Sequence, residues 1–298
     1  KSKYINVTKL VCHTTSTTNL VNLEEVIRKK SFDYVFHFGE LVGESYCEKN
    51  PQRTRQINTV ATYNVFRLVQ QNDARLIYNS TSSVYGYREN PALLVEDDSF
   101  PRENMTQYRK NKIKAERALL RLGKQHPDFG YIALRPATVA GLSVRMRLDL
   151  LPHVFTYAAL KNKGVVDITD QHHYRAVINI DDLVDAYMAI LNSDRWRNGI
   201  FNVGHHNLTK AEYADEISKI VPLEQKMVEA QGDLRNVKIS SKAFEQGFGF
   251  RASRSIQDTV RPLVELLREK PDLFSRDNYY GVINMPVEKF LKLVGLNQ

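Results

Sequence analysis

Short apolar segments of strand length alternate with segments of helix length, and this alternation constrains the fold more than any other feature of the chain. Strands are predicted at Tyr34 to Phe38, Arg75 to Asn79 and Tyr131 to Arg135. The spacing of apolar residues between them predicts helices over Asn58 to Gln71 and Asn104 to Gly123. Strands joined by helix-length crossovers lie parallel, so the sequence predicts an α/β fold with a doubly wound parallel sheet.

Further elements are predicted on both sides of this alternation. They are a strand at Lys9 to Cys12, a helix at Leu20 to Lys30, a helix from about Leu150 to Lys163, strands at Val165 to Ile168, Tyr174 to Ile180 and Gly199 to Val203, helices at Leu183 to Leu191, Lys210 to Ile220, Ile256 to Arg268 and Val287 to Val294, and a loop at Pro271 to Met285. The character of the sequence changes at Leu142. We therefore expect a cofactor domain of residues 1–141 with 176–204, and a smaller substrate domain of 142–175 with 205–298.

Composition narrows the classes of function. No apolar run approaches the ~20 residues that span a bilayer, so no membrane segment is predicted. The net charge of +8 is spread along the chain without an arginine-rich tail, which disfavours nucleic acid and allows an anionic small substrate. Two cysteines, Cys12 and Cys47, lack metal-ligand spacing. No metal is predicted, and a reducing compartment follows, with the cytoplasm favoured and an organelle left open.

Three residues could carry acid–base chemistry. Tyr108 and Lys112 lie one helical turn apart, and Thr81 follows the end of a predicted central strand, where ligands bind in such sheets. A tyrosine base at neutral pH needs its pKa lowered from about 10 to near 7, which costs roughly 4 kcal/mol and is aided by a nearby ammonium. A second Tyr-x-x-x-Lys pair, Tyr157 and Lys161, follows no such strand and is expected to be structural.

These residues belong to an ordered set of motifs. The motifs are Tyr34 to Gly39, Gln56 to Asn58, Ser80 to Gly86, Tyr108 with Lys112, Leu134 to Gly141, Arg175 before Ile180 to Asp182, Phe201 to Gly204, and Asp233 with Arg235. In order and spacing the set resembles the extended short-chain dehydrogenase/reductases, and more narrowly the NAD-dependent nucleotide-sugar epimerase/dehydratase family. The resemblance implies a Rossmann-like cofactor domain, NAD as cofactor and a nucleotide-diphosphate sugar as substrate.

The resemblance also implies a role for each matching residue. Tyr108 would be the base, Lys112 would hold the nicotinamide ribose and lower the pKa of the tyrosine, and Thr81 would bind the reacting sugar hydroxyl. The residues implied along the cofactor are Phe38, Gly39 and Asn58, together with Tyr108 and Lys112. Those implied at the substrate are Thr81, Ser82, Thr138, Arg175 and Arg235, where the arginines match diphosphate-binding positions.

Two positions after Thr81 bear on the type of reaction. Relatives that eliminate water usually carry Asp-Glu there, and decarboxylating relatives keep a glutamate at the second position, whereas this chain has Ser82 and Ser83. We therefore predict an enzyme of the isomerase class, an NAD-dependent epimerase that moves a hydride transiently from a sugar carbon. The predicted helices Asn58 to Gln71 and Asn104 to Gly123 match those that relatives use to dimerise, so the resemblance implies a homodimer.

The front of the chain departs from the family pattern. Relatives begin with a strand and a Gly-x-x-Gly-x-x-Gly turn that binds the pyrophosphate, but Gly39 and Gly43 have the wrong spacing and follow a later strand. Either about fifty to sixty residues precede Lys1 in the native protein, or the chain is a degenerate member. The alternative function is therefore a structural subunit of a larger assembly, RNA-containing or organellar, and NAD versus NADP stays open.

Overall fold

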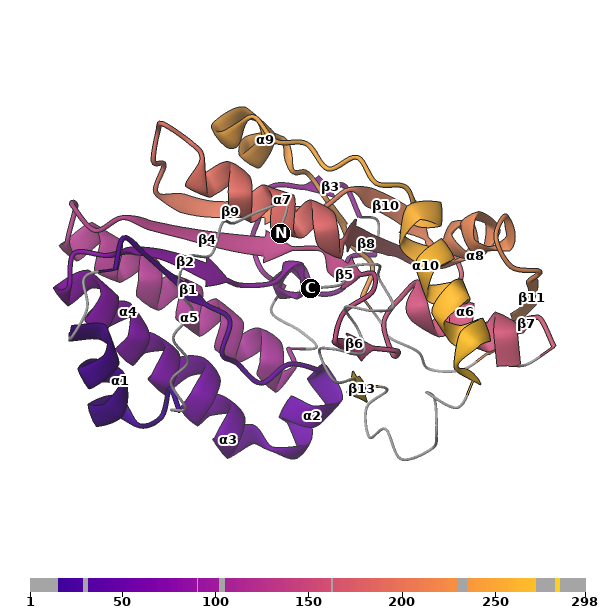
Figure 1. The fold of residues 1–298 in the computed structure, drawn as a ribbon, viewed down its shortest axis with the longest axis horizontal. Helices are drawn as coiled ribbons and strands as arrows, with labels where there is room; N and C mark the ends of the chain where they lie inside the picture. The colour runs from indigo at the N-terminus through magenta and orange to yellow at the C-terminus, as the bar shows by residue number, and fades with distance from the viewer. Residues whose placement is uncertain are drawn as a thin grey trace.

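The computed structural model describes residues 16–28, 32–89, 91–101, 105–161, 163–229 and 235–271, and the backbone of 282–284. At its centre is a four-stranded parallel sheet in the order β1-β2-β4-β9. These strands are β1 (Tyr34–His37), β2 (Arg75–Asn79), β4 (Tyr131–Pro136) and β9 (Gly199–Val203). Helices cover the two faces of the sheet (Figure 1), which confirms the predicted Rossmann-like class.

The remaining elements surround this sheet or form the smaller part of the molecule. The helices are α1 (Leu20–Arg28), α2 (Glu44–Lys49), α3 (Pro51–Arg55), α4 (Thr62–Gln71), α5 (Gln107–Gln125), α6 (His153–Lys161), α7 (Ile180–Leu191), α8 (Lys210–Ser218), α9 (Lys242–Phe248) and α10 (Ile256–Glu269), with a π-helix η1 (Gln56–Ala61) and a 3-10 helix η2 (Ser82–Tyr85). The remaining strands are β3 (Leu93–Leu94), β5 (Thr138–Ala140), β6 (Arg145–Arg147), β7 (Val165–Ile168), β8 (Tyr174–Asn179), β10 (His206–Thr209), β11 (Glu224–Met227), β12 (Lys238–Ile239) and β13 (Val282–Asn284). In Figure 1, α1, α4 and α5 lie below the sheet, and α7 and α9 lie above it.

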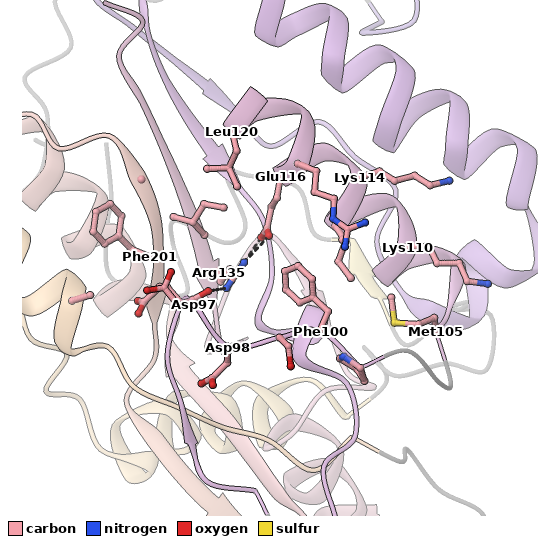
Figure 2. Close-up of a pocket in the computed structure, with 18 of the residues that line it drawn as sticks. Asp97, Asp98, Phe100, Met105, Lys110, Lys114, Glu116, Leu120, Arg135 and Phe201 are labelled. Carbon is pink, nitrogen blue, oxygen red and sulfur yellow. Dashed lines mark hydrogen bonds and ion pairs between the residues drawn. The ribbon is translucent and has the colours of Figure 1, made fainter. Parts of the chain in front are cut away.

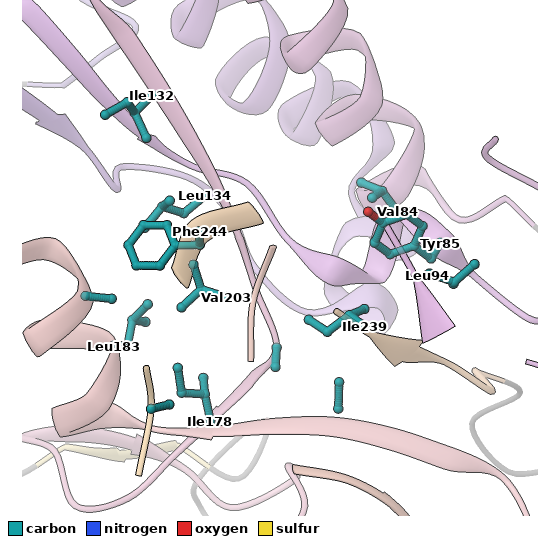
Figure 3. Packing of buried hydrophobic residues seen from close by; sticks show 14 of the residues in the cluster. Val84, Tyr85, Leu94, Ile132, Leu134, Ile178, Leu183, Val203, Ile239 and Phe244 are labelled. Atoms are coloured by element: carbon teal, nitrogen blue, oxygen red, sulfur yellow. The ribbon is translucent and has the colours of Figure 1, made fainter. Parts of the chain in front are cut away.

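The central strands are buried on both faces. Along β2, Ile77 packs in one apolar cluster, while its neighbours Leu76 and Tyr78 pack in another. Successive side chains of a strand point to opposite faces, so each face of the sheet has its own core. Figure 3 shows the first cluster, in which Leu134 of β4 lies near Phe244 of α9. This burial explains why the strand segments appear as almost continuous apolar runs.

A second sheet carries β8. Its order is β10-β8-β5, with β8 antiparallel to β10 and parallel to β5. Ala176 and Ile178 of β8 pack in the same cluster as Leu134, whereas Val177 packs in a cluster with α8 and α10 residues such as Tyr213 and Val260. The second sheet therefore lies between the main core and the helices of the smaller part.

The helix that carries the predicted base starts with a cap. The side chain of Thr106 accepts a hydrogen bond from the backbone N–H of Arg109 at 3.3 Å, which satisfies one of the free donors at a helix start. Tyr108 and Lys112 consequently occupy the first turns of α5. The helix predicted over Asn58 to Gln71 begins instead as the π-helix η1, and α4 follows from Thr62.

Pairing between segments distant in sequence produces the main differences from the prediction. The loop predicted at Pro271 to Met285 contains β13, which pairs antiparallel with β6, and β6 itself occupies part of Arg145 to Asp149. The predicted strand Lys9 to Cys12 and helix Val287 to Val294 lie outside the described residues. Among the helices that the structure describes, none is long and apolar enough to cross a membrane.

A buried ion pair ties α5 to β4. Arg135 donates from Nε and Nη2 to the two carboxylate oxygens of Glu116, at 2.9 and 2.8 Å, and both side chains are nearly inaccessible. Ser80 donates to the same carboxylate at 2.5 Å, and Tyr85 lies 2.7 Å from Arg135 Nη1. Figure 2 shows the pair side by side. The carboxylate and the guanidinium therefore each have several partners.

We expect Glu116→Gln to lower the free energy of unfolding by about 3–5 kcal/mol, because it leaves the buried Arg135 without its counter-charge. Denaturant unfolding measures the change. The matched control is Glu24→Gln on α1, where Glu24 pairs with the exposed Arg28 and the expected loss is below about 0.5 kcal/mol. A loss at Glu116 as small as that at Glu24 would contradict the importance of the buried pair.

Candidate active site

Thr81, Tyr108 and Lys112 lie together at the carboxyl end of β2. Thr81 begins the turn after β2, and its Oγ1 accepts a hydrogen bond from the backbone N–H of Ser83 at 3.1 Å. The Thr81 hydroxyl also hydrogen-bonds Tyr108. Lys112, one turn further along α5, has its Nζ 5.9 Å from the centre of the Tyr108 ring. The strand end and the first turns of the helix therefore bring these three side chains into one site.

The Tyr108 phenol is protonated in this environment. Burial raises the pKa of Tyr108 to about 12, and the hydrogen bond from Thr81 acts in the opposite direction because it stabilises the phenolate. Arg147 of β6 also favours the phenolate. Its guanidinium is bonded to Asp149 at 3.0 and 2.5 Å. Additional positive charge is needed before Tyr108 can act as a base at neutral pH.

Lys112 is a buried cation with defined partners. Its Nζ contacts the Glu40 carboxylate and donates to the backbone carbonyl of Asn79 at 2.6 Å. The side chains of Lys112 and Glu40 are each only 2% exposed. Burial lowers the pKa of Lys112 to about 7, while the carboxylate of Glu116 acts against that shift. The Glu40 carboxylate in contact with Nζ also favours the ammonium. The Lys112 ammonium is therefore held between α5 and the sheet by its contacts with Glu40 and Asn79.

Sequence reasoning assigned no role to Glu40 or Arg147. Glu40 lies three residues beyond the end of β1, in a loop where nothing in the local pattern predicts burial. Arg147 is in a basic segment, but its position near Tyr108 depends on how β6 packs. The one available signal was the position of Glu40 after the carboxyl end of a predicted strand, because such ends hold functional side chains in parallel sheets.

The residues expected along the cofactor fall into two groups. Phe38, at the end of β1, is 53% exposed and packs edge-on against Tyr187, and Gly39 follows it. Asn58 is fully buried, and its side-chain amide bonds both the N–H and the carbonyl of Leu41, at 2.8 and 2.7 Å. Asn58 thus holds the loop after β1, whereas Phe38 is open to a ligand.

The residues expected at the substrate are spread over two sheets. Arg235 Nη1 donates to Ser83 Oγ at 3.1 Å, beside the Thr81 turn, and Ser82 starts η2 in the same turn. Thr138 and Arg175 lie on the adjacent strands β5 and β8, where Thr138 pairs with Val177. The structure thus brings Arg235 and Ser82 to Thr81 and places Thr138 and Arg175 on the second sheet.

The second Tyr-x-x-x-Lys pair lies on α6. Lys161 Nζ donates to the carbonyl of Pro271 at 3.0 Å, and the helix packs against α10 and β7. Neither Tyr157 nor Lys161 follows a strand of the main sheet. The pair therefore fits the structural role expected for it.

A separate cavity of about 960 Å³ opens between α5, β9 and the loop at 96–101. Figure 2 shows Lys110 and Lys114 along one side of it and Asp97 and Asp98 near the other. Thr81, Tyr108 and Lys112 do not line it. This cavity is therefore distinct from the site at the end of β2.

With the geometry established, comparison with known proteins identifies the family. A model of the NAD dependent epimerase/dehydratase family matches residues 2–204. The chain belongs to this family, which confirms the resemblance found in the sequence and makes NAD the family's cofactor. The bifunctional UDP-glucose 4-epimerase and UDP-xylose 4-epimerase 1 of Pisum sativum is 25% identical over 275 residues, covering 82% of this chain and 75% of the relative.

Other comparisons widen the range of reactions and confirm the fold. UDP-glucuronic acid decarboxylase 5 of Arabidopsis thaliana is 25% identical over 212 residues, covering 67% of this chain and 60% of that protein. RMD from Pseudomonas aeruginosa complexed with NADPH superposes with a TM-score of 0.75 at 19% identity, covering 88% of this chain and 90% of that one. UDP-glucose 4-epimerase from Bifidobacterium longum, in complex with NAD+ and UDP, superposes with a TM-score of 0.74 at 18% identity. The match covers 88% of this chain and 84% of that one.

The described residues fit the nicotinamide end of such a cofactor. The exposed Phe38 ring, Gly39 and the Tyr108–Lys112 turn of α5 gather at the carboxyl ends of β1 and β2, the edge at which parallel sheets bind nucleotides. The sequence contains no Gly-x-x-Gly-x-x-Gly turn for the pyrophosphate. The residues that would hold the nicotinamide end are therefore Phe38, Gly39, Tyr108 and Lys112.

We expect His37 to lower the free energy of unfolding as the solution becomes more acidic. Burial and the charge of Lys112 lower the pKa of His37 from 6.5 to about 4, so the folded state keeps a neutral imidazole bonded to Thr62 at 3.0 Å. Below pH 6.5 the unfolded chain takes up a proton that the folded chain refuses. The free energy of unfolding should therefore decrease between pH 6.5 and about 4, in total by about 3 kcal/mol from this residue.

Urea unfolding at several pH values tests this dependence. His37→Gln should flatten the decrease, and the exposed His172, changed to Gln, is the matched control. Burial also lowers the pKa of His153, so some slope remains in every variant and the difference between variants isolates His37. An identical slope in wild-type protein and His37→Gln would disprove the assignment.

Proposed function

We propose that this protein is an NAD-dependent epimerase that inverts one carbon of a nucleotide-diphosphate sugar. The observation that carries the proposal is the hydrogen bond between Thr81 and Tyr108 beside the buried Lys112, at the carboxyl end of β2. Membership of the epimerase/dehydratase family supports it. The UDP-glucose 4-epimerases among the relatives act on substrates of this class.

Thr81 and Tyr108 together can hold and deprotonate a sugar hydroxyl. Because Thr81 Oγ1 accepts from the Ser83 N–H, its own proton is free to be donated to the phenol oxygen or to a sugar oxygen. Tyr108 accepts the proton of the sugar hydroxyl as the carbon is oxidised and returns it when the carbon is reduced. When bound, NAD supplies the acceptor and donor of the carbon-bound hydride.

Charge around Tyr108 determines whether it can be a base. At a pKa of about 12, ionisation at pH 7 costs about 7 kcal/mol. This pKa already includes the favourable effect of the Arg147 guanidinium. An oxidised nicotinamide would add a further positive charge that favours the phenolate, beside the Lys112 ammonium. The base is therefore generated mainly in the loaded site, which limits proton abstraction to the complex that can use it.

The residues beside Thr81 favour epimerisation over elimination. Ser82 and Ser83 carry hydroxyls where an acid and a base would be needed to eliminate water, and Ser83 Oγ accepts a hydrogen bond from Arg235. Without a carboxyl group at either position, this turn supplies no acid–base pair for elimination, which favours simple reduction of the oxidised carbon. The relatives include decarboxylases as well as epimerases, so this local difference supports the choice of reaction.

Binding roles follow from charge and position. Arg235, which contacts the Thr81 turn, and the buried Arg175 are proposed to bind the diphosphate, with Thr138 near the sugar. We also propose a homodimer formed by α4 and α5, on the basis of the resemblance. Exposed Tyr63 on α4 and Leu120 on α5 fit an apolar helix contact.

Incubating the protein with NAD and a panel of nucleotide sugars, followed by proton NMR, tests the proposed function. We expect inversion at C4 of one sugar, a carbon that bears a hydroxyl which Tyr108 can deprotonate as the hydride leaves. Tyr108→Phe should lower kcat by about 10²- to 10⁴-fold, since it removes the acid–base group. Tyr157→Phe is the matched control and should leave kcat within about twofold, because Tyr157 lies on α6 away from the site. Wild-type activity in Tyr108→Phe would exclude Tyr108 as the base, whereas no turnover of any nucleotide sugar by the wild-type protein would favour the alternative, a structural subunit.

Thr81→Val should weaken the reaction with little change in fold. The substitution keeps the shape and removes the hydroxyl that bonds Tyr108, so kcat should fall by about 10- to 100-fold, the effect expected for a hydrogen bond to a charged group. Steady-state kinetics on the substrate identified by NMR measures the fall. Ser218→Ala, which removes an exposed hydroxyl on α8, is the control. Equal effects of the two substitutions would mean that the Thr81 contact has no special role.

A further inference from the structure

Glu40 is a buried carboxylate that the proposed reaction does not otherwise use. One of its oxygens, Oε1, accepts hydrogen bonds from the hydroxyls of Tyr78 at 2.9 Å and Thr62 at 3.2 Å. The other, Oε2, contacts the Lys112 ammonium. Three donors from β2, α4 and α5 therefore converge on this one carboxylate, which indicates an ionised group in a built site.

The loop that carries Glu40 is fixed independently of Lys112. The next residue, Leu41, has both its N–H and its carbonyl bonded to the buried Asn58 amide, at 2.8 and 2.7 Å. Asn58 lies in η1, whose helix continues into α4 and Thr62. The position of Glu40 is thus set by β1 and α4, and the carboxylate acts as a fixed anchor for the side chain on α5.

Charged and titratable groups face Lys112 from several elements. Glu40 touches the ammonium, the Tyr78 ring lies 4.8 Å away, and the Tyr108 ring lies 5.9 Å away. His37 of β1 is neutral because burial and Lys112 lower its pKa. Glu116 is bonded to Arg135 through both of its carboxylate oxygens. Its charge is therefore largely balanced there, which leaves Glu40 as the counter-ion in direct contact with Lys112.

We infer that Glu40 is a positioning residue for the reaction: it keeps Lys112 as an ammonium and holds that ammonium close to Tyr108. This inference rests on the proposed function for its catalytic meaning, but the contact itself does not. Because Glu40 and Lys112 are nearly inaccessible, an ammonium without this carboxylate would lose its proton readily. Tyr108 would then lose a cation that favours its phenolate.

The fixed anchor also limits how Lys112 can move. Its Nζ is held between the Glu40 carboxylate and the Asn79 carbonyl, both on the sheet side of α5. A ligand hydroxyl that binds Lys112 must therefore share an ammonium already bonded twice. The geometry suits a lysine that contributes charge and one remaining N–H, rather than a freely swinging side chain.

The test measures the protonation of Lys112 in the protein without substrate. Protein containing carbon-13-labelled lysine is titrated by NMR, and the Lys112 signal is assigned by its loss in Lys112→Arg. In Glu40→Gln we expect the midpoint of the Lys112 titration to fall by more than about one pH unit, a tenfold loss of proton affinity. The matched control is Glu44→Gln, because Glu44 pairs at 3.1 Å with Arg109, which lies on the same helix as Lys112. This control should leave the midpoint of the Lys112 titration unchanged.

An unchanged Lys112 midpoint in Glu40→Gln would overturn the inference. If that variant does not fold, Glu40→Asp gives the same comparison, because the shorter side chain draws the carboxylate away from Lys112 while keeping the buried charge. A lowered midpoint in Glu40→Asp supports the inference, and an unchanged one overturns it.

Kinetics separates this inference from the proposed function. In Glu40→Gln, kcat should fall most on the alkaline side of the pH profile, where Lys112 is neutral, and KM should change little. A shifted Lys112 titration together with no turnover of any nucleotide sugar would sink the proposed function and leave the Glu40 contact standing. Turnover of a nucleotide sugar together with an unshifted Lys112 titration would overturn the Glu40 inference and leave the proposed function standing.

Discussion

The packing of one face of α5 against the sheet is the constraint on which the rest of the structure depends. Tyr108, Lys112 and Glu116 follow one another at four-residue spacing, so they lie along a single stripe of the helix. A polar stripe can be buried only if its groups are paired. Glu40 receives Lys112, and Arg135 receives Glu116. The two ion pairs thus fix the register of α5 on the sheet, and with it the position of Tyr108, the proposed base.

The same pairing links stability to chemistry. A buried ion pair is costly to form and more costly to break, so folding as well as the proposed reaction depends on this geometry. The Tyr108 phenol, at the N-terminal end of the stripe, has its pKa raised by burial, and the Arg147 guanidinium acts in the opposite direction. Tyr108 is consequently protonated at neutral pH in this environment and would need added positive charge to act as the base of the proposed reaction.

Local sequence information was enough for the parallel sheet and for the three residues at the end of β2, since both follow from periodicity, helical spacing and the order of motifs. It was not enough for features set by distant partners. Glu40 appeared as an ordinary loop residue because its burial depends on Lys112, 72 positions away. Likewise, β13 looked like a loop because its partner strand β6 lies far back in the chain. Asn58, in the π-helix η1, bonds Leu41, a long-range contact that local helix propensity does not contain.

The central claim is that this site oxidises and reduces one sugar carbon in place, and running the inversion in heavy water tests it most directly. Hydride transfer returns the original hydrogen to the same carbon, so the inverted sugar should contain no deuterium at that carbon by mass spectrometry and NMR. Incorporation of deuterium at the inverted carbon with each turnover would contradict the account, because it would mean that the carbon loses a proton to solvent rather than a hydride.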